Sequence, residues 1–390
     1  MTTSATTSPT VKVIRDALPP DARQRSLRIG ALYFLATGVV YLALLVAMPL
    51  TGAWWARLIV AMACGLSIGM LFIVGHDACH GSLTPSSRVN AVLGRIAFLP
   101  SLHPYAAWEY SHNALHHGFT NLRGKDPVYC PFSVAEFTAL PSWRQRLERL
   151  YRSLPGLLPL YLVEIWWKLE MAPHGEHRAH IDKRGTYQLD RAIVLAYPIV
   201  QAALLTLVLR GRGAGAVDTA AVIALASTVP FLTFTWLIGF ATFQHHTHPR
   251  VLWYADAEEW NFYRAQVQST VHVVFLRWIE RLLHNIIEHT AHHVDTKVPL
   301  YNLTGAQREL ETTFGDAVIA EPFSFAALRR TFRSCCLYDF TTHQWLDFAG
   351  RATPEPRPLW WRNEAAGTGG RPAGARTIDS ASSRQPTATR

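Results

Sequence analysis

The histidines of this chain are spaced in a way that could bind metal ions. The sequence holds 18 His among 390 residues, and three short motifs, HDACH, HNALHH and HTAHH, gather many of them. Side chains three and four residues apart share one face of a helix, so each motif is predicted to aim two or three imidazoles at one point. Imidazole is the commonest metal-binding side chain. The predicted metal ligands are His76, His80, His112, His116, His117, His289, His292 and His293.

Eight imidazoles are enough to hold two metal ions, and the sequence therefore predicts a two-metal site. A structural zinc site takes four ligands and usually includes Cys, whereas the chain has only five Cys and no CxxC pair. Nitrogen ligation without thiolate suits zinc, copper, iron or nickel, and spacing does not choose among them. Redox reasoning favours iron, because a metal pair beside an apolar membrane slot is suited to reducing O2 and attacking C–H bonds.

Four apolar segments must position these motifs. They run over about 30–50, 54–75, 192–210 and 219–243, and each is long enough to cross a bilayer, which takes about 20 residues. Short links join them into two hairpins. Buried helices of a large soluble protein are the alternative, but four nearly uncharged runs of this length rarely occur together in one. Charged residues are also only 17% of the chain, against about 25% in soluble domains.

The order of the motifs along the chain predicts that they meet on one side of the membrane. Two motifs lie between the hairpins and the third follows the second hairpin, so an even number of crossings separates them. Five basic residues before the first span place that side in the cytoplasm. The predicted fold is an all-α integral membrane protein, with four transmembrane helices in two hairpins and a cytosolic helical cap that carries the histidines.

Charge and composition predict three regions. Residues 1–29 form a basic cytosolic N-terminal tail, residues 30–350 the membrane domain, and residues 351–390 a disordered C-terminal tail rich in Arg, Ala, Gly and Pro. The net charge of +9 lies mostly in the two tails. Basic tails beside apolar spans suit an anionic membrane surface better than nucleic acid. The apolar but interrupted stretch 153–171 is predicted to be an interfacial helix.

The three histidine motifs resemble the histidine boxes of the integral-membrane fatty acid desaturase family. The stretches AWEYSHNALHHGFTN (107–121) and HNIIEHTAHHVDTKVPLYN (284–302) are similar to the Δ12, or ω-6, branch of that family. The element QHHTHP (244–249) resembles that branch's QHTHP, with one extra His. The second box also has three residues between its first histidines where plant Δ12 enzymes have two. The resemblance covers about 30–310.

The resemblance implies that the eight box histidines hold a di-iron centre. A related branch has a further ligand near the last span, and His248 is assigned to this ninth position, with His246 and His284 as alternatives. Acidic residues are expected to orient the ligands, and the candidates are Asp77, Glu109, Asp126, Glu288 and Asp295. His174, His177 and His180 are interpreted as a solvated basic surface, and His103, His272 and His343 as histidines without a metal.

The implied activity is a membrane-bound fatty acyl desaturase that uses O2 and two electrons to introduce a cis double bond. The second and fourth spans would line an apolar slot for the acyl chain, with Trp54, Trp55 and Trp236 as candidates for its wall or for the membrane interface. The acyl group could be linked to a lipid, to CoA or to a carrier protein.

Electrons must come from a separate donor such as ferredoxin or cytochrome b5. The chain has no Cys cluster for iron–sulfur, no dinucleotide fingerprint and no fused cytochrome motif HPGG. Hydroxylases, acetylenases, epoxygenases and carotenoid ketolases share the scaffold and remain alternatives. A non-enzymatic metal carrier is a remote one, because transporters place ionisable residues within their spans, and these spans are nearly free of charge.

Overall fold

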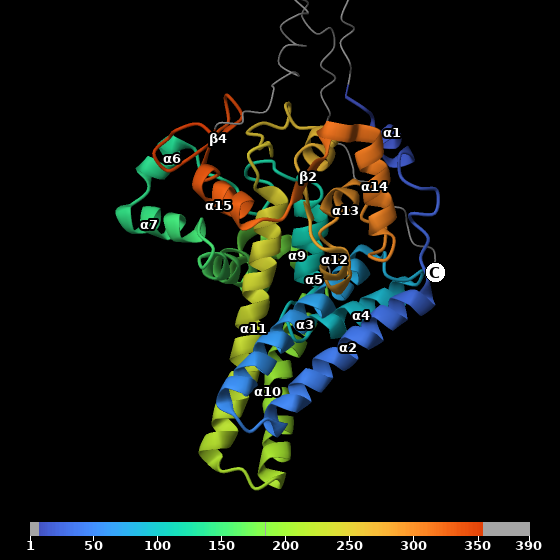
Figure 1. Ribbon diagram of the computed structural model, residues 1–390, viewed down its shortest axis with the longest axis vertical. Coiled ribbons are helices and arrows are strands. Elements are labelled where there is room, and N and C mark those ends of the chain that lie inside the picture. The colour runs from blue at the N-terminus through green and yellow to red at the C-terminus, as the bar shows by residue number, and fades with distance from the viewer. Residues whose placement is uncertain (1–7, 184, 354–390) are drawn as a thin grey trace, which may run out of the picture. The chain divides into compact units, whose positions relative to one another are not determined.

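The computed structural model of the protein describes residues 8–183 and 185–353 (Figure 1). The N-terminal half holds α1 (Val11–Asp16), α2 (Leu27–Leu50), α3 (Trp54–His80), α4 (Ser87–Phe98), α5 (Tyr105–Trp108), η1 (Glu109–His116), α6 (Val134–Ala139), α7 (Ser142–Tyr151), α8 (Leu157–Leu160), η2 (Tyr161–Met171) and α9 (Gly175–Asp182). The rest holds α10 (Tyr187–Gly211), α11 (Ala216–His246), η3 (Tyr263–Val267), β1 (Val271–Val274), α12 (Arg277–Leu282), α13 (His289–Val294), α14 (Leu303–Phe314), η4 (Gly315–Ala317), β2 (Ile319–Pro322), α15 (Phe325–Ser334), β3 (Leu337–Asp339) and β4 (Gln344–Leu346). The predicted C-terminal tail lies outside the described residues from 354 onward.

Among the described residues, four helices are long and apolar enough to cross a membrane, which confirms the predicted fold class. They are α2, α3, α10 and α11, and they form the two expected hairpins α2–α3 and α10–α11. Two of these helices extend beyond their apolar segments, since α3 ends at His80 and α11 ends at His246. The polar residues after 75 and 243 end the hydrophobic run but not the helix. His76, His80, His245 and His246 therefore lie near the ends of two spanning helices.

Gly81 ends α3 directly after its second histidine. Its φ is +68°, in the left-handed region that glycine adopts without a steric penalty. The chain can therefore turn away at once and leave His80 at the very end of the helix.

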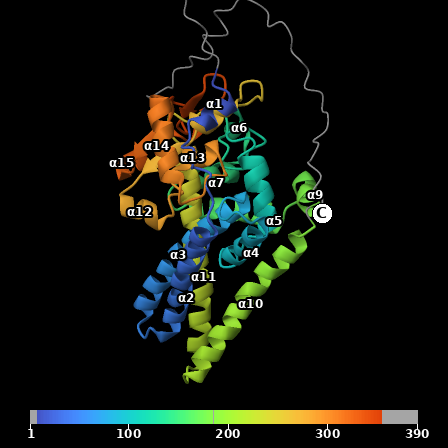
Figure 2. The same ribbon diagram turned by 90° about the vertical axis from the view of Figure 1, so that its right-hand side faces the viewer.

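The part of the structure beyond the spans is helical, with two small sheets that the sequence analysis did not predict. Strand β1 pairs in parallel with β2, with Val271 opposite Ile319, and β3 pairs antiparallel with β4. Residues 8–26 pack onto this region, because Ile14 and Leu18 are buried in the same apolar cluster as Val294 and Leu310. Figures 1 and 2 show α1 beside α14, far from the α10–α11 turn.

The stretch predicted as an interfacial helix forms α8 and the wider-wound η2. One face is buried against α11, with Tyr161 and Glu170 inside, while Trp167 on the other face is exposed. Trp166 donates from Nε1 to the carbonyl of Leu102 at 2.8 Å. The segment is amphipathic, as the sequence suggested, and its inner face helps to enclose the site.

Helices α3 and α11 approach each other closely at Gly65. A Cβ added there would lie 2.5 Å from Cβ of Thr233 and 2.7 Å from the carbonyl oxygen of Pro230. Small residues at such crossings let membrane helices pack through their backbones. Since both helices carry metal-site histidines, this contact also fixes the distance between them.

We predict that Gly65→Ala destabilises the protein. Overpacking of this kind costs about 1–3 kcal/mol, so the thermal unfolding midpoint in detergent should fall clearly. Gly38→Ala on α2 is the matched control, because no atom lies within 4 Å of its added Cβ. Equal midpoints for the two variants would contradict the close contact.

Candidate metal centre

Nine histidines converge in two groups at the ends of α3 and α11. Within each group, one ring nitrogen of every histidine lies within 4.8 Å of those of the others. The first group is His76, His80, His112, His117 and His292, and the second is His116, His246, His289 and His293. They come from α3, from η1 and the residue after it, from α11 and from α13. All eight histidines of the three sequence motifs are therefore brought together.

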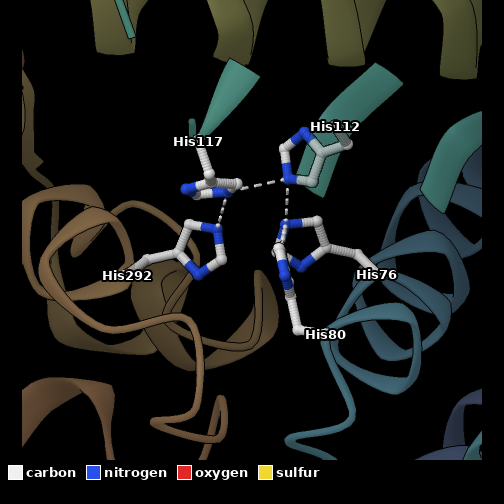
Figure 3. Close-up of side chains that lie close together, drawn as sticks. All are labelled: His76, His80, His112, His117 and His292. Atoms are coloured by element: carbon white, nitrogen blue, oxygen red, sulfur yellow. Dashed lines mark hydrogen bonds between the residues drawn. The ribbon is translucent and has the colours of Figure 1, made fainter. Parts of the chain in front are cut away.

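The first group gathers its Nε2 atoms around one point (Figure 3). Nε2 of His112 lies 2.8 Å from Nε2 of His76 and 3.1 Å from Nε2 of His117. Nε2 of His292 lies 3.0 Å from that of His117, and Nε2 of His80 lies 3.3 Å from that of His76. Figure 3 shows the five rings pointing toward one another from three separate segments.

The second group is completely buried. Nε2 of His289 lies 2.9 Å from Nε2 of His246. The ring centroid of His116 lies 4.6 Å from that of His246 and 4.9 Å from that of His293. This group is built from η1, α11 and α13 and contains no residue of the HDACH motif.

Each motif aims two imidazoles at one group, as predicted, but two of the three motifs also give a histidine to the other group. Only HDACH keeps both of its histidines together, since His76 and His80 both join the first group. Neighbouring residues on a helix do not face the same way. His116 and His117 therefore serve different groups, and so do His292 and His293. The paired histidines of the second and third motifs thus supply both groups at once.

The structure also places the predicted ninth ligand elsewhere. His248 follows the end of α11 and its Nε2 contacts Oε2 of Glu321 at 3.1 Å, outside both groups. His246, still on the last turn of α11, lies in the second group instead. The shift of two positions from His246 to His248 matters because α11 ends at His246, and the chain beyond the helix turns away from the group. His284 bonds Thr37 on α2 at 3.1 Å and also lies outside the groups.

The ring nitrogens have the properties of metal ligands. Burial, and then the neighbouring imidazoles, lower the pKa of His112, His117 and His293 well below the usual histidine value. These rings are therefore neutral near pH 7 and keep a lone pair. Nε2 of His293 is buried without a hydrogen-bond partner, while its Nδ1 bonds Oε1 of Gln266 at 2.8 Å. Such a set of converging neutral donors fits divalent transition-metal ions.

Two of the predicted acidic residues contact the ligands. Asp126 accepts from Nδ1 of His116 at 3.0 Å, and backbone N–H groups of Asn121 and Val128 hold the carboxylate in place. Oδ1 of Asp77 lies 3.3 Å from Nδ1 of His76, and Oδ2 accepts from the backbone N–H of Leu300 at 2.6 Å. Each contact orients a ring so that its other nitrogen faces the group.

Three further acidic candidates have other surroundings. Asp295 pairs with Arg23, whose Nε lies 2.6 Å away. Glu288 is buried just before α13, and burial raises its pKa to about 7. Glu109 begins η1.

Gln266 is a site residue that the sequence analysis missed. It is buried on η3, receives the Nδ1 contact of His293 and donates from Nε2 to the carbonyl of His117 at 2.9 Å. It thus ties the second and third histidine motifs together. No motif marks it, since it lies 23 residues before His289 in a segment without periodic pattern.

The histidines set aside in the sequence lie outside the two groups. His103 bonds the carbonyl of Ser101, His272 contacts Glu311 and His343 contacts Glu259. His180 stacks on Tyr110. His245 stacks on His289 with ring centroids 3.9 Å apart but joins neither group.

An apolar cavity of about 510 Å³ leads to the histidines. Leu66 and His76 both line it, and they are ten residues apart on α3, which corresponds to about 15 Å of helix. Trp236 and His246 line it over a similar length of α11. The cavity therefore runs along the second and fourth spans, as expected, and reaches both histidine groups through His112 and His289. Trp54 and Trp55 are exposed at the start of α3, so of the three predicted tryptophans Trp236 lines it.

Comparison with known proteins assigns the family. The sequence model of the family described as fatty acid desaturase matches residues 52–323, well over half of the chain. The sn-1 oleoyl-lipid 12-desaturase of Picosynechococcus sp. is 27% identical over 301 residues, which cover 76% of this chain and 80% of that protein. The protein of the same name from Synechocystis sp. is 27% identical over 317 residues, covering 80% of this chain and 82% of that one.

A plant relative is similar to the same extent. The chloroplastic omega-6 fatty acid desaturase of Spinacia oleracea is 26% identical over 314 residues, covering 80% of this chain and 64% of that protein. With four membrane-length helices and clustered histidines in place, the family match leads to one conclusion. This chain belongs to the fatty acid desaturase family and is a membrane-bound oxidoreductase of lipid metabolism.

Proposed function

We propose that this protein is a di-iron fatty acyl desaturase that introduces a cis double bond into an acyl chain with O2 and two electrons. The observation that carries the proposal is one cavity, lined mostly by apolar side chains, that ends at two groups of converging imidazoles. Five ligands in one group and four in the other suit two irons with positions left for O2. The names of the relatives favour the 12, or ω-6, position of an oleoyl chain.

Bound iron would supply the oxidising chemistry, by activating O2 to remove two hydrogens from neighbouring methylenes. The work of the chain is then to position an unreactive substrate. The cavity wall of Phe72, Ile73 and Phe240 holds the acyl chain by apolar contact alone. An apolar wall disfavours water in the same space, which would limit side reactions. Asp126, Asp77 and Gln266 hold the rings in fixed orientations.

Electrons are proposed to come from a separate protein such as ferredoxin or cytochrome b5, on the cytoplasmic side. The positive-inside rule places the N-terminus there, and α1 packs in the same apolar cluster as α13. The histidine groups and the N-terminal segment therefore share one side of the membrane. This side is where a soluble electron carrier has access.

Expression in a host that lacks polyunsaturated lipids tests the proposal directly. We expect new double bonds, located by mass spectrometry, and their loss together with bound iron in His116→Ala and His292→Ala. Each variant removes a ligand of a different group. Double-bond formation that survives both substitutions would disprove the metal assignment, and a hydroxylated product would reassign the protein to the hydroxylases.

The ninth ligand is tested by comparing His246→Ala with His248→Ala. We expect His246→Ala to lose close to half of the bound iron, because it takes one of only four ligands from the second group. His248→Ala should keep its iron, since that ring contacts Glu321 instead. Iron per protein is measured by elemental analysis. The opposite result would restore His248 as the ligand.

Asp126→Asn should weaken iron binding without removing a ligand. Loss of a carboxylate that orients a metal-binding His costs about 10–100-fold in affinity. Competition with a chelator measures this, and Asp182→Asn on α9, whose exposed carboxylate pairs with half-buried Arg178, is the control. Unchanged affinity in Asp126→Asn would show that the contact to His116 has no part in metal binding.

A further inference from the structure

A short segment outside the four spans exposes apolar and basic side chains together. In and just before α12, Leu276 is 65% exposed and Trp278 is 63% exposed. The basic side chains of Arg277 and Arg281 are also exposed. Exposed Leu and Trp mixed with Arg is the composition of a helix lying in a membrane interface. Such a surface would be unfavourable in water alone.

The contacts of this segment place it beside a membrane-spanning helix. Two residues after α12, His284 bonds Oγ1 of Thr37 at 3.1 Å and packs edge-on against the ring of Tyr33. Both partners belong to α2, and Thr37 lies ten residues into that helix, about 15 Å from its start. Helix α2 runs obliquely to α11, and α12 lies near the upper ends of α2 and α3 in both views (Figures 1 and 2). The segment therefore packs beside a membrane-spanning helix, in the half of that helix nearer its N-terminal end.

The same segment forms part of the cavity wall. Phe275, Trp278, Ile279, Leu282 and Ile286 all line the cavity that leads to the histidines. Trp278 is both a lining residue and largely exposed, so it stands where the cavity opens. The opening consequently faces the surface that carries Leu276 and the two arginines.

The charges at this opening suit a phosphate. Arg277 lies 3.7 Å from the carboxylate of Glu280, but its own side chain remains 59% exposed while Glu280 is buried. Glu280 accepts from the backbone N–H of Phe275 and points inward. Two guanidinium groups therefore face outward around Trp278, and guanidinium binds phosphate in a planar, bidentate way.

We propose that residues 276–286 form a lateral doorway through which the acyl chain of an intact membrane phospholipid enters the cavity past Trp278, while its phosphate stays with Arg277 and Arg281. This deepens the proposed function, on which it rests for the fate of the bound chain. Acyl-CoA or an acyl carrier protein, arriving from water, is the competing outcome.

The position of the doorway is tested without any enzymatic turnover. Leu276→Cys is labelled with an environment-sensitive fluorophore, and the full-length protein is reconstituted into phosphatidylcholine vesicles that contain phosphatidylglycerol. The five native cysteines are buried or half-buried, so the label goes to the new site. We expect a blue-shifted emission that lipids spin-labelled near the headgroup quench. Thr341→Cys, exposed between β3 and β4, is the control and should stay unquenched.

The occupant is tested by photocrosslinking. A phosphatidylglycerol with a diazirine in its acyl chain should label peptides of α3 and α11 that line the cavity. Each arginine near a lipid surface contributes about 1 kcal/mol, a factor of about five. The double variant Arg277→Glu and Arg281→Glu should therefore reduce labelling at least about fivefold. The control reverses exposed Arg308 and Arg351 and should label like the unaltered protein.

The outcomes separate this proposal from the proposed function. A water-exposed label at position 276, or cavity labelling by a photoreactive acyl-CoA that outcompetes the lipid, overturns the doorway even if the protein makes double bonds. Lipid labelling of the cavity in a protein that binds no iron and makes no double bonds leaves the doorway standing and overturns the desaturase assignment.

Discussion

The rest of the structure depends on bringing nine imidazoles together at two points inside the protein. Burial and the neighbouring imidazoles lower the pKa of His80, His112 and His292, and an unpaired polar group in such a place is costly. Adjacent ring nitrogens lie about 3 Å apart in both groups. No single helix can hold such a set, because a helix repeats its face only every three or four residues. The donors must therefore come from several helices fixed rigidly against one another.

Long-range contacts between the histidine segments supply that rigidity. Asp77 touches His76 and also receives the backbone N–H of Leu300, so it joins the first histidine motif to the chain just after the third. Gln266 joins the second motif to the third in the same way. The N-terminal segment adds two further contacts. Arg15 donates a hydrogen bond to the carbonyl of Val294, and Arg25 donates one to the carbonyl of Gly81. Each motif is held from outside by a residue far away in sequence.

The sequence predicted the parts of this arrangement that are local. The apolar runs gave the four spans, and the HxxxH and HxxHH spacings gave eight of the nine gathered histidines. It could not divide them between two groups, because His116 and His117 look equivalent in a motif and differ only by the rotation of the helix. The family resemblance favoured His248 over His246, and composition does not show that α11 continues to His246. Gln266 and the two small sheets arise from tertiary contacts with no local pattern.

The division of neighbouring histidines has a consequence for the cavity. Because His116 and His117 join different groups, and His292 and His293 likewise, the same two short segments supply ring nitrogens to both groups. The cavity is lined by His76 and His112 of the first group and by His116, His246 and His289 of the second. An acyl chain in this one cavity would thus approach both groups, and the proposed removal of two neighbouring hydrogens depends on such positioning.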